Sequence, residues 1–172
     1  MGQELAQLGV EGFHVFHDLP ARGFNIDHVV VGDAGIFAVE TKGRSKPDRT
    51  SGGEPGWRAQ FDGVYVKFPG GRDSKPVDQT VRQAKWLEDW LTSAVGEPVM
   101  VQPLLVLPGW FVERAGPGIP VIGSGEIRGY FGKQGSRSPL SEQVVQRIVH
   151  QLDQRCRNVE PRAYRARTRA KD

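Results

Sequence analysis

Two apolar runs decide the fold of this chain: Asn25-Ile26-Asp27-His28-Val29-Val30-Val31-Gly32 and Gly35-Ile36-Phe37-Ala38-Val39-Glu40-Thr41-Lys42. β-Branched and aromatic residues predict a strand in each run, and the short turn at Asp33 predicts that the two strands pair antiparallel. Because a strand alternates its faces, Glu40 and Lys42 point the same way, about 6.6 Å apart along the chain. Asp27, on the first run, would then lie near them.

These three charged residues allow two interpretations. In the first, Glu40 and Lys42 form a surface salt bridge and Asp27 caps a turn, as isolated charges commonly do. In the second, they form a functional site. We favour the site because the apolar neighbours predict that both strands are largely buried, and a buried charge is costly unless it is paired or metal-bound.

Length and composition fit one globular domain. The chain has 172 residues, of which 38% are hydrophobic and 25% charged, enough for one core. We expect a single domain over residues 1–160 and a basic, flexible tail over residues 161–172. The net charge is only +3, but the tail holds five cations and one acid, so it either contacts phosphates or is a solvated end.

The sequence also bears on the cellular compartment. Cys156 is the one cysteine, so an internal disulfide is excluded and a reducing compartment is favoured. No apolar run approaches the roughly 20 residues of a membrane span, and the N-terminus lacks the pattern of a secretory signal. We therefore expect a cytoplasmic protein without a membrane partner; the oligomeric state stays open.

The remaining pattern alternates strands and helices. An Asp62-Gly63 turn between two aromatic-rich runs predicts a hairpin, and Ser138-Pro139 predicts the start of a last helix. The expected elements are a short helix over 3–9, a strand from residue 13 that ends over 18–20, strands over 57–61, 64–68, 99–107 and 119–122, and helices after residues 74, 124 and 138. This order predicts an α/β fold, a sandwich with a mixed central sheet flanked by helices.

The helix after Ser74 carries two stripes. One is apolar and predicts packing on a sheet; its members are Val77, Val81, Ala84, Leu87, Leu91 and Val95. The other, expected on the opposite side, consists of Gln79, Gln83, Trp86 and Trp90. These side chains either reach a ligand or are covered by another element, and for the two tryptophans we expect burial.

Two carboxylates on neighbouring strand ends suit a hard divalent cation such as Mg²⁺, with Mn²⁺ as the alternative, because these ions take oxygen ligands. A lysine two residues past the second carboxylate would hold a water or stabilise a pentacovalent phosphate. Such a set hydrolyses phosphodiesters, and the basic strip after the second strand suits a polyanion. The strip comprises Lys42, Arg44, Lys46 and Arg49.

At this point the chain resembles a known family. Asp27, the later Glu40-Thr41-Lys42 and a helix opened by Pro76-x-x-Gln79 are similar to the PD-(D/E)XK nucleases. Within that superfamily, the two opening runs resemble the nuclease-related domain called NERD, over roughly residues 13–107. The resemblance implies a restriction-endonuclease-like fold.

The resemblance also implies roles for individual residues. Asp27 and Glu40 would bind the metal together with the backbone carbonyl of Thr41, and Lys42 would act at the water and the scissile phosphate. Gln79 would orient this group, with Gln83 as a helper one turn later. The chain departs from the pattern in two places: Ile26 stands where the superfamily name has proline, and Glu4 on a short stub is the candidate for an acid that other members carry on a longer first helix.

Three functions follow as hypotheses. The first is a Mg²⁺-dependent nuclease that acts on DNA, with RNA as the alternative substrate. The second is a catalytically weak or inactive nucleic-acid-binding or regulatory module of the same fold. The third, a hydrolase of small phosphate esters, is disfavoured because the sequence has no glycine-rich phosphate loop.

Overall fold

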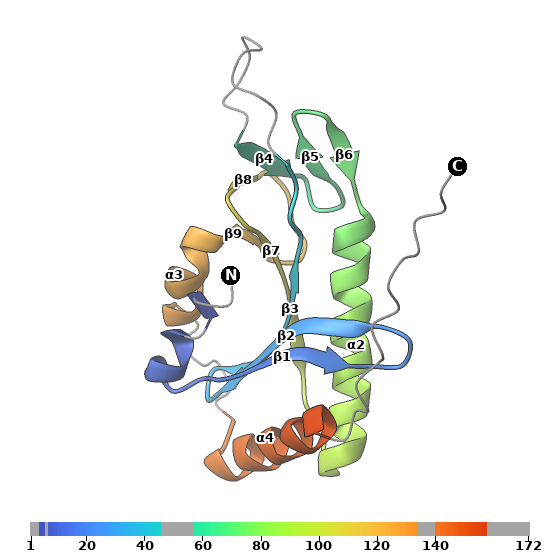
Figure 1. Cartoon of the computed structure of the whole chain (residues 1–172), viewed down its shortest axis with the longest axis vertical. Coiled ribbons are helices and arrows are strands. Elements are labelled where there is room, and N and C mark those ends of the chain that lie inside the picture. Colours follow the sequence, from blue (N-terminus) through green and yellow to red (C-terminus); the bar gives the residue numbers. More distant parts are fainter. Residues whose placement is uncertain (1–3, 6, 46–56, 134–139, 158–172) are drawn as a thin grey trace, which may run out of the picture.

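A five-stranded mixed sheet forms the centre of the protein (Figure 1). The computed structural model describes residues 4–5, 7–45, 57–133 and 140–157. The strand order is β1-β2-β3-β7-β9, in which β1, β2 and β3 pair antiparallel and β3, β7 and β9 pair parallel. The bounds are β1 His14–Pro20, β2 Asn25–Gly32, β3 Gly35–Thr41, β7 Val101–Leu107 and β9 Val121–Gly123.

A second, smaller sheet extends the molecule beyond the carboxyl end of β3. Its order is β6-β5-β4-β8, with β4 and β8 parallel and the other pairs antiparallel. The bounds are β4 Arg58–Phe61, β5 Val66–Phe68, β6 Gly71–Asp73 and β8 Phe111–Arg114. Its inner face packs on the end of β7 and on the first turn of α2, through Phe61, Phe68, Leu105, Leu107 and Val77.

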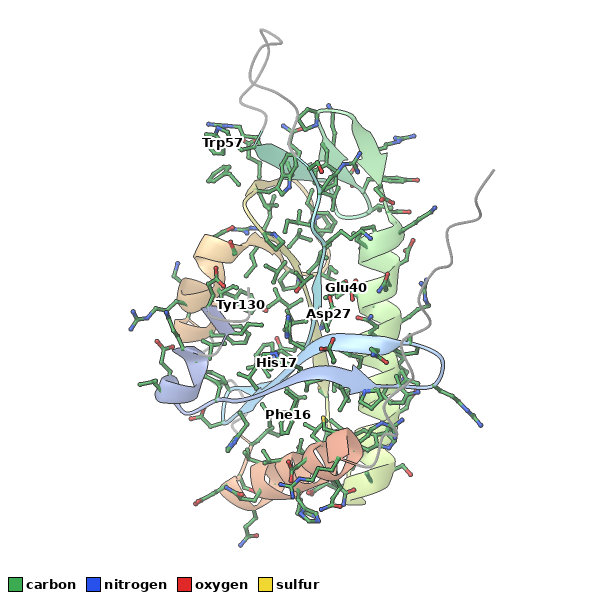
Figure 2. All side chains as sticks on the ribbon, in the orientation of Figure 1. Phe16, His17, Asp27, Glu40, Trp57 and Tyr130 are labelled. Carbon is green, nitrogen blue, oxygen red and sulfur yellow. The ribbon has the colours of Figure 1, made fainter. Side chains whose placement is uncertain are left out.

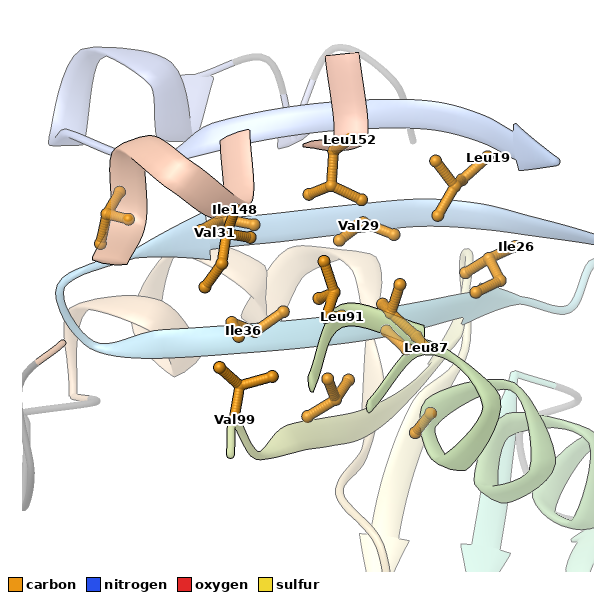
Figure 3. Close-up of a cluster of buried hydrophobic side chains, with 14 residues drawn as sticks. Leu19, Ile26, Val29, Val31, Ile36, Leu87, Leu91, Val99, Ile148 and Leu152 are labelled. Carbon is orange, nitrogen blue, oxygen red and sulfur yellow. The ribbon is translucent and has the colours of Figure 1, made fainter. Parts of the chain in front are cut away.

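Helices cover both faces of the central sheet. Helices α2 (Lys75–Val95) and α4 (Glu142–Arg157) pack on the face that carries Val29, Val31, Ile36 and Ala38 (Figure 3). The opposite face, with Val30, Phe37 and Val39, is covered by η1 (Gln7–Glu11) and by α3 (Ile127–Gly132), which follows the short η2 (Ser124–Glu126). The expected α/β sandwich with a mixed central sheet is therefore confirmed.

Most of the expected elements are present, with shifted boundaries. Strand β1 begins one residue later than predicted, at His14, and ends at Pro20, within the expected end over residues 18–20. The hairpin at Asp62-Gly63 is confirmed, but its loop spans four residues, because Phe61 pairs with Val66. Gly63 has φ +106 and lies so close to the carbonyl of Pro117 that a Cβ there would clash. Strands β6 and β8 were not predicted.

One detail of the helix predictions was wrong. Val81 belongs to the predicted apolar stripe of α2 but is 44% exposed, because the buried face is rotated toward Thr80, Gln83 and Leu87. In the last helix, Val145 is buried and Val144 packs half-buried against the same cluster. The predicted start at residues 138–139 and the tail 161–172 lie outside the described residues.

The two tryptophans of α2, expected to be buried, are half-buried and partly covered by α4. Trp86 and Trp90 stack with ring centroids 6.0 Å apart, and the guanidinium of Arg155 on α4 lies 4.9 and 4.8 Å from the two centroids. Arg155 also donates to the carbonyl of Pro20. The cation therefore links α4, α2 and β1. Along the described residues, no helix has the length and apolarity needed to span a bilayer.

Candidate active site

Strands β2 and β3 separate at the point where the expected site begins. Their pairing ends at His28 and Val39, so the backbone of Thr41 has no β2 partner. The side chain of Asp27 takes that place, because the Thr41 amide donates to Asp27 Oδ2 over 2.8 Å. Asp27 thus closes the end of the ladder with a carboxylate instead of a peptide carbonyl.

The chain bends at the same point. Ile26 and Val29 contribute to one hydrophobic cluster although they are three residues apart, so the strict alternation of a strand is broken around Asp27. The paired strand has a matching irregularity, since Asp18 has φ 49 in the left-handed region, where only Gly, Asn and Asp are common. This distortion accompanies the separation of β2 from β3.

The register of β3 also orients the backbone of Thr41. Lys42 donates its amide to the carbonyl of Val106 on β7, and Thr41 is the register partner of Val106. In a parallel ladder, this arrangement points the backbone groups of residues 40 and 42 toward β7 and those of Thr41 away from it. The Thr41 carbonyl therefore faces the same side of the strand as Asp27.

Glu40, labelled beside Asp27 in Figure 2, is buried. Both of its carboxylate oxygens accept hydrogen bonds. Its side chain is 5% exposed. Gln79 Nε2 donates to Oε1 over 2.9 Å, and Gln83 Nε2 donates to Oε2 over 2.9 Å. Gln83 also reaches the carbonyl of Asn25 at 3.3 Å. Two consecutive turns of α2 thus fix this carboxylate over the sheet.

The surroundings of Glu40 shift its acidity. Burial raises the pKa of this carboxyl above 4.5, the hydrogen bond from Gln83 lowers it, and the negative charge of Asp27 raises it again. The cation of Lys42 acts in the lowering direction. The pKa of Glu40 is therefore shifted by both charged residues that the sequence grouped with it, Asp27 and Lys42.

The chain matches one family of known proteins. The model of the nuclease-related domain, NERD, matches residues 1–108, more than half of the 172 residues. The chain belongs to the NERD family. The matched part contains Asp27, Glu40, Lys42 and both glutamines. Comparison with curated proteins and with solved structures gave no match.

In this NERD domain the glutamines sit differently from the sequence prediction. Gln79 and Gln83 were placed on the side of α2 opposite its core, but Gln83 is only 2% exposed, so that prediction was wrong for Gln83. Both amides contact Glu40 rather than Lys42. Gln79 and Gln83 face the sheet, where they supply the two hydrogen-bond donors that satisfy the buried Glu40 carboxylate.

Lys42 lies one residue beyond β3 and its side chain is exposed. In the described part of the chain it forms no ion pair with Glu40, so the surface salt bridge of the alternative interpretation is absent. The ammonium group is therefore accessible to a bound anion on the side of the strand where the NERD domain holds Glu40.

Glu4 does not complete an acidic cluster. Among the described residues, no three His, Cys, Asp or Glu side chains come together in a way that would hold a metal ion. The stub that carries Glu4 packs through Leu5 and Leu8 on the face of Val30, Phe37 and Val39, whereas Glu40 follows Ile36 and Ala38 on the other face.

A divalent cation fits the remaining donors. Two carboxylates and one carbonyl are the oxygen ligands that Mg²⁺ takes when it keeps several waters. Each Glu40 oxygen accepts one amide hydrogen bond, which leaves acceptor capacity on both. Two further oxygens here, Thr41 Oγ1 and Gln83 Oε1, are buried without a hydrogen-bond partner. Unpartnered buried oxygens are rare in folded proteins. Gln83 Oε1, on the side chain that contacts Glu40, would suit an ion's bound water, whereas strand alternation places Thr41 Oγ1 on the Phe37 and Val39 face of β3.

A histidine pair next to Asp27 was not singled out by the sequence. His17 on β1 and His28 on β2 are register partners, with their Nδ1 atoms 2.7 Å apart. Burial lowers the pKa of His28, and the neighbouring His17 lowers it further. Their 11-residue separation has no helical or motif spacing, so only the antiparallel register of β1 and β2 reveals the pair.

Proposed function

We propose that this NERD domain is a Mg²⁺-dependent nuclease that hydrolyses DNA phosphodiester bonds. One observation carries the proposal: the buried Glu40 carboxylate is held at both oxygens by Gln79 and Gln83, on a strand that presents Thr41 to Asp27. A carboxylate fixed in this way loses little rotational freedom when it binds a ligand, which is what a preorganised site requires.

Each residue has a role in this proposal. Asp27, Glu40 and the Thr41 carbonyl would hold Mg²⁺, which would supply Lewis-acid stabilisation of charge on the phosphate. Gln79 and Gln83 would keep Glu40 oriented. The exposed Lys42 would donate to the attacking water or to a non-bridging phosphate oxygen, where negative charge grows in the transition state.

The substrate class follows from charge and access. Lys42 is exposed, as are Gly43 and Arg44 after it, so the proposed site opens to solvent beside cations. A polyanionic backbone suits such an open, basic edge. DNA is the preferred substrate, and the cytoplasmic location expected from the sequence is retained, with the unpaired Cys156 as its support.

Nicking of supercoiled plasmid tests the proposal. We expect nicking in Mg²⁺ or Mn²⁺, none in EDTA, and a loss of at least about 100-fold in Lys42→Ala, the size of effect typical for a transition-state donor. Lys133→Ala is the matched control, because Lys133 is an exposed lysine at the end of α3, which packs on the face of the sheet opposite Glu40. Full activity of Lys42→Ala with a native fold would refute the mechanism.

One observation favours the second candidate, a catalytically weak or inactive nucleic-acid-binding module. No third acid joins Asp27 and Glu40 among the described residues, and two acidic ligands hold a metal less tightly than three. Under this alternative the plasmid assay stays blank in either metal while DNA binding persists in EDTA. Parallel assays with single-stranded DNA, RNA and a small phosphodiester would separate the remaining substrate classes.

A further inference from the structure

The outer face of the second sheet presents aromatic rings and cations to solvent. We call this surface the outer platform and define it by Trp57, Arg58, Lys67, Arg72 and Phe111. The inner face of the same sheet is buried, with Ala59, Phe61, Val66, Phe68 and Val112 each at most 4% exposed. The outer side chains are therefore not needed to close the core.

Two aromatic rings lie at one end of the outer platform. Trp57 is 40% exposed and Phe111 is 49% exposed, at the end of the molecule where Figure 2 labels Trp57. Their centroids are 5.9 Å apart with an interplanar angle of 83°. The guanidinium of Arg58 lies 5.4 and 5.5 Å from these two centroids. The three side chains support one another in an orientation that leaves ring surface open.

The strand register extends the platform with cations. Gln60 pairs with Lys67, and Lys67 pairs with Arg72, so Lys67 and Arg72 lie side by side on the outer face. The Arg72 guanidinium lies 4.7 Å from the ring centroid of Tyr65, which adds a third aromatic group.

The acids near this surface have other partners. Glu113 forms an ion pair with Arg58 at 2.6 Å and accepts from Gln60. Asp62 lies near Arg72, and its Oδ1 accepts the amides of Val64 and Tyr65. Within the described residues neither Lys67 nor Arg72 forms an ion pair. The outer platform thus offers two cations without a direct ion pair beside open aromatic faces.

We propose that the outer platform binds single-stranded nucleic acid. Unpaired bases stack on exposed aromatic side chains, and their phosphates are attracted by neighbouring cations. The bases of a duplex are already stacked on one another and cannot reach such rings. The biological role of this binding rests on the proposed function. A nuclease that holds a single strand would act preferentially on DNA with junctions, gaps or frayed ends. The binding itself does not require catalysis.

Fluorescence anisotropy of a labelled oligothymidylate, measured on the full chain in EDTA, tests the inference. We expect the double variant Trp57→Ala/Phe111→Ala to bind at least about ten-fold more weakly, because each base–aromatic stack contributes substantially. Binding of a labelled duplex of equal length is expected to change less than two-fold. Met100→Ala is the matched control, because Met100 is 81% exposed and lies elsewhere on the surface.

A second variant separates charge from stacking. Lys67→Ala/Arg72→Ala should weaken oligothymidylate binding and reduce its salt slope by about 1 to 2, while quenching of Trp57 fluorescence by the bound strand persists. All four outer substitutions leave buried residues untouched, so a thermal melt is expected to show the native fold.

The outcomes distinguish this inference from the nuclease proposal. Because EDTA excludes cleavage, single-strand binding that depends on Trp57 and Phe111 supports the platform even if plasmid nicking fails. Equal losses on single and double strands, or unchanged binding in both double variants, would overturn it. A fall in the sedimentation mass of the aromatic variant without nucleic acid would overturn it too, and would assign the surface to self-association.

Discussion

Gln83 on helix α2 donates through Nε2 to Oε2 of Glu40 over 2.9 Å, and both side chains are at most 5% exposed. The contact joins the helix to the end of strand β3 in the interior of the protein. It makes the glutamine a structural element as well as a positioning group for the proposed site.

Gln83→Ala is expected to lower both stability and activity. Removal of the amide leaves a buried carboxylate oxygen without its donor, which costs about 1–3 kcal/mol of unfolding free energy. Urea denaturation measures this loss, and plasmid nicking measures the activity. Gln146→Ala on the exposed side of α4 is the control. If both variants unfold at the same urea concentration, the Glu40 contact has no energetic weight.

Glu40→Gln is expected to abolish cleavage yet stabilise the protein above neutral pH. Burial raises the pKa of Glu40, so the folded state holds this proton more tightly than the unfolded state does. The resulting stabilisation is fully present below the unfolded pKa of about 4.5 and is lost as the pH rises through the folded pKa. The neutral glutamine avoids that loss.

Thermal melts from pH 4 to pH 8 test the direction of this pH dependence of stability. The Tm of Glu40→Gln should exceed that of the wild type at pH 8, and the difference should shrink toward pH 4. A Tm difference that grows as the pH falls would show that Glu40 is instead stabilised in its ionised form. His28 shifts the stability of both proteins equally over the same range, because its lowered pKa is common to them.

Divalent metal is expected to stabilise the wild type through Asp27. A ligand that binds only the folded state at 100 times its Kd adds about 2.7 kcal/mol, or roughly 5–10 °C in Tm for a chain of this size. Asp27→Asn keeps an oxygen that can accept from Thr41 but removes the charge, so its Tm should respond little to Mg²⁺ or Mn²⁺. Asp33→Asn, in the exposed turn between β2 and β3, should respond like the wild type.

Much of the central sheet could be predicted because its signals are local. The apolar runs around Val29–Val31 and Ile36–Val39 specify two buried strands, and Asp33 with Gly35 specifies the tight turn. The four-residue hairpin loop, by contrast, depends on the contact of Gly63 with Pro117, more than 50 residues away. Strand β8 was missed for a similar reason: of its four residues only Val112 is buried, and its pairing partner β4 lies far back in the sequence.

The sequence grouped Glu40, Gln79 and Gln83 as candidate residues but did not predict how they contact one another. Parity places Glu40 and Lys42 on one face, and helical spacing places Gln79 and Gln83 one turn apart. The rotation of α2 that buries Gln83 depends on how the helix docks against β3, as does the exposure of Val81. The hydrogen bond from Thr41 to Asp27 requires β2 and β3 to separate. No local sequence pattern in β2 predicts this separation.

The carbonyl that Thr41 turns toward Asp27 has a consequence for how freely this position can vary. A peptide oxygen is supplied by every amino acid, so any residue at position 41 that keeps the strand extended would present the same donor to a cation. The side chain at position 41 can therefore vary with the packing around it. In this chain it is a threonine whose buried hydroxyl has no hydrogen-bond partner. Between Glu40 and Lys42, for which we propose specific roles, the chain thus has one position at which a mutation can alter packing while the backbone oxygen is unchanged.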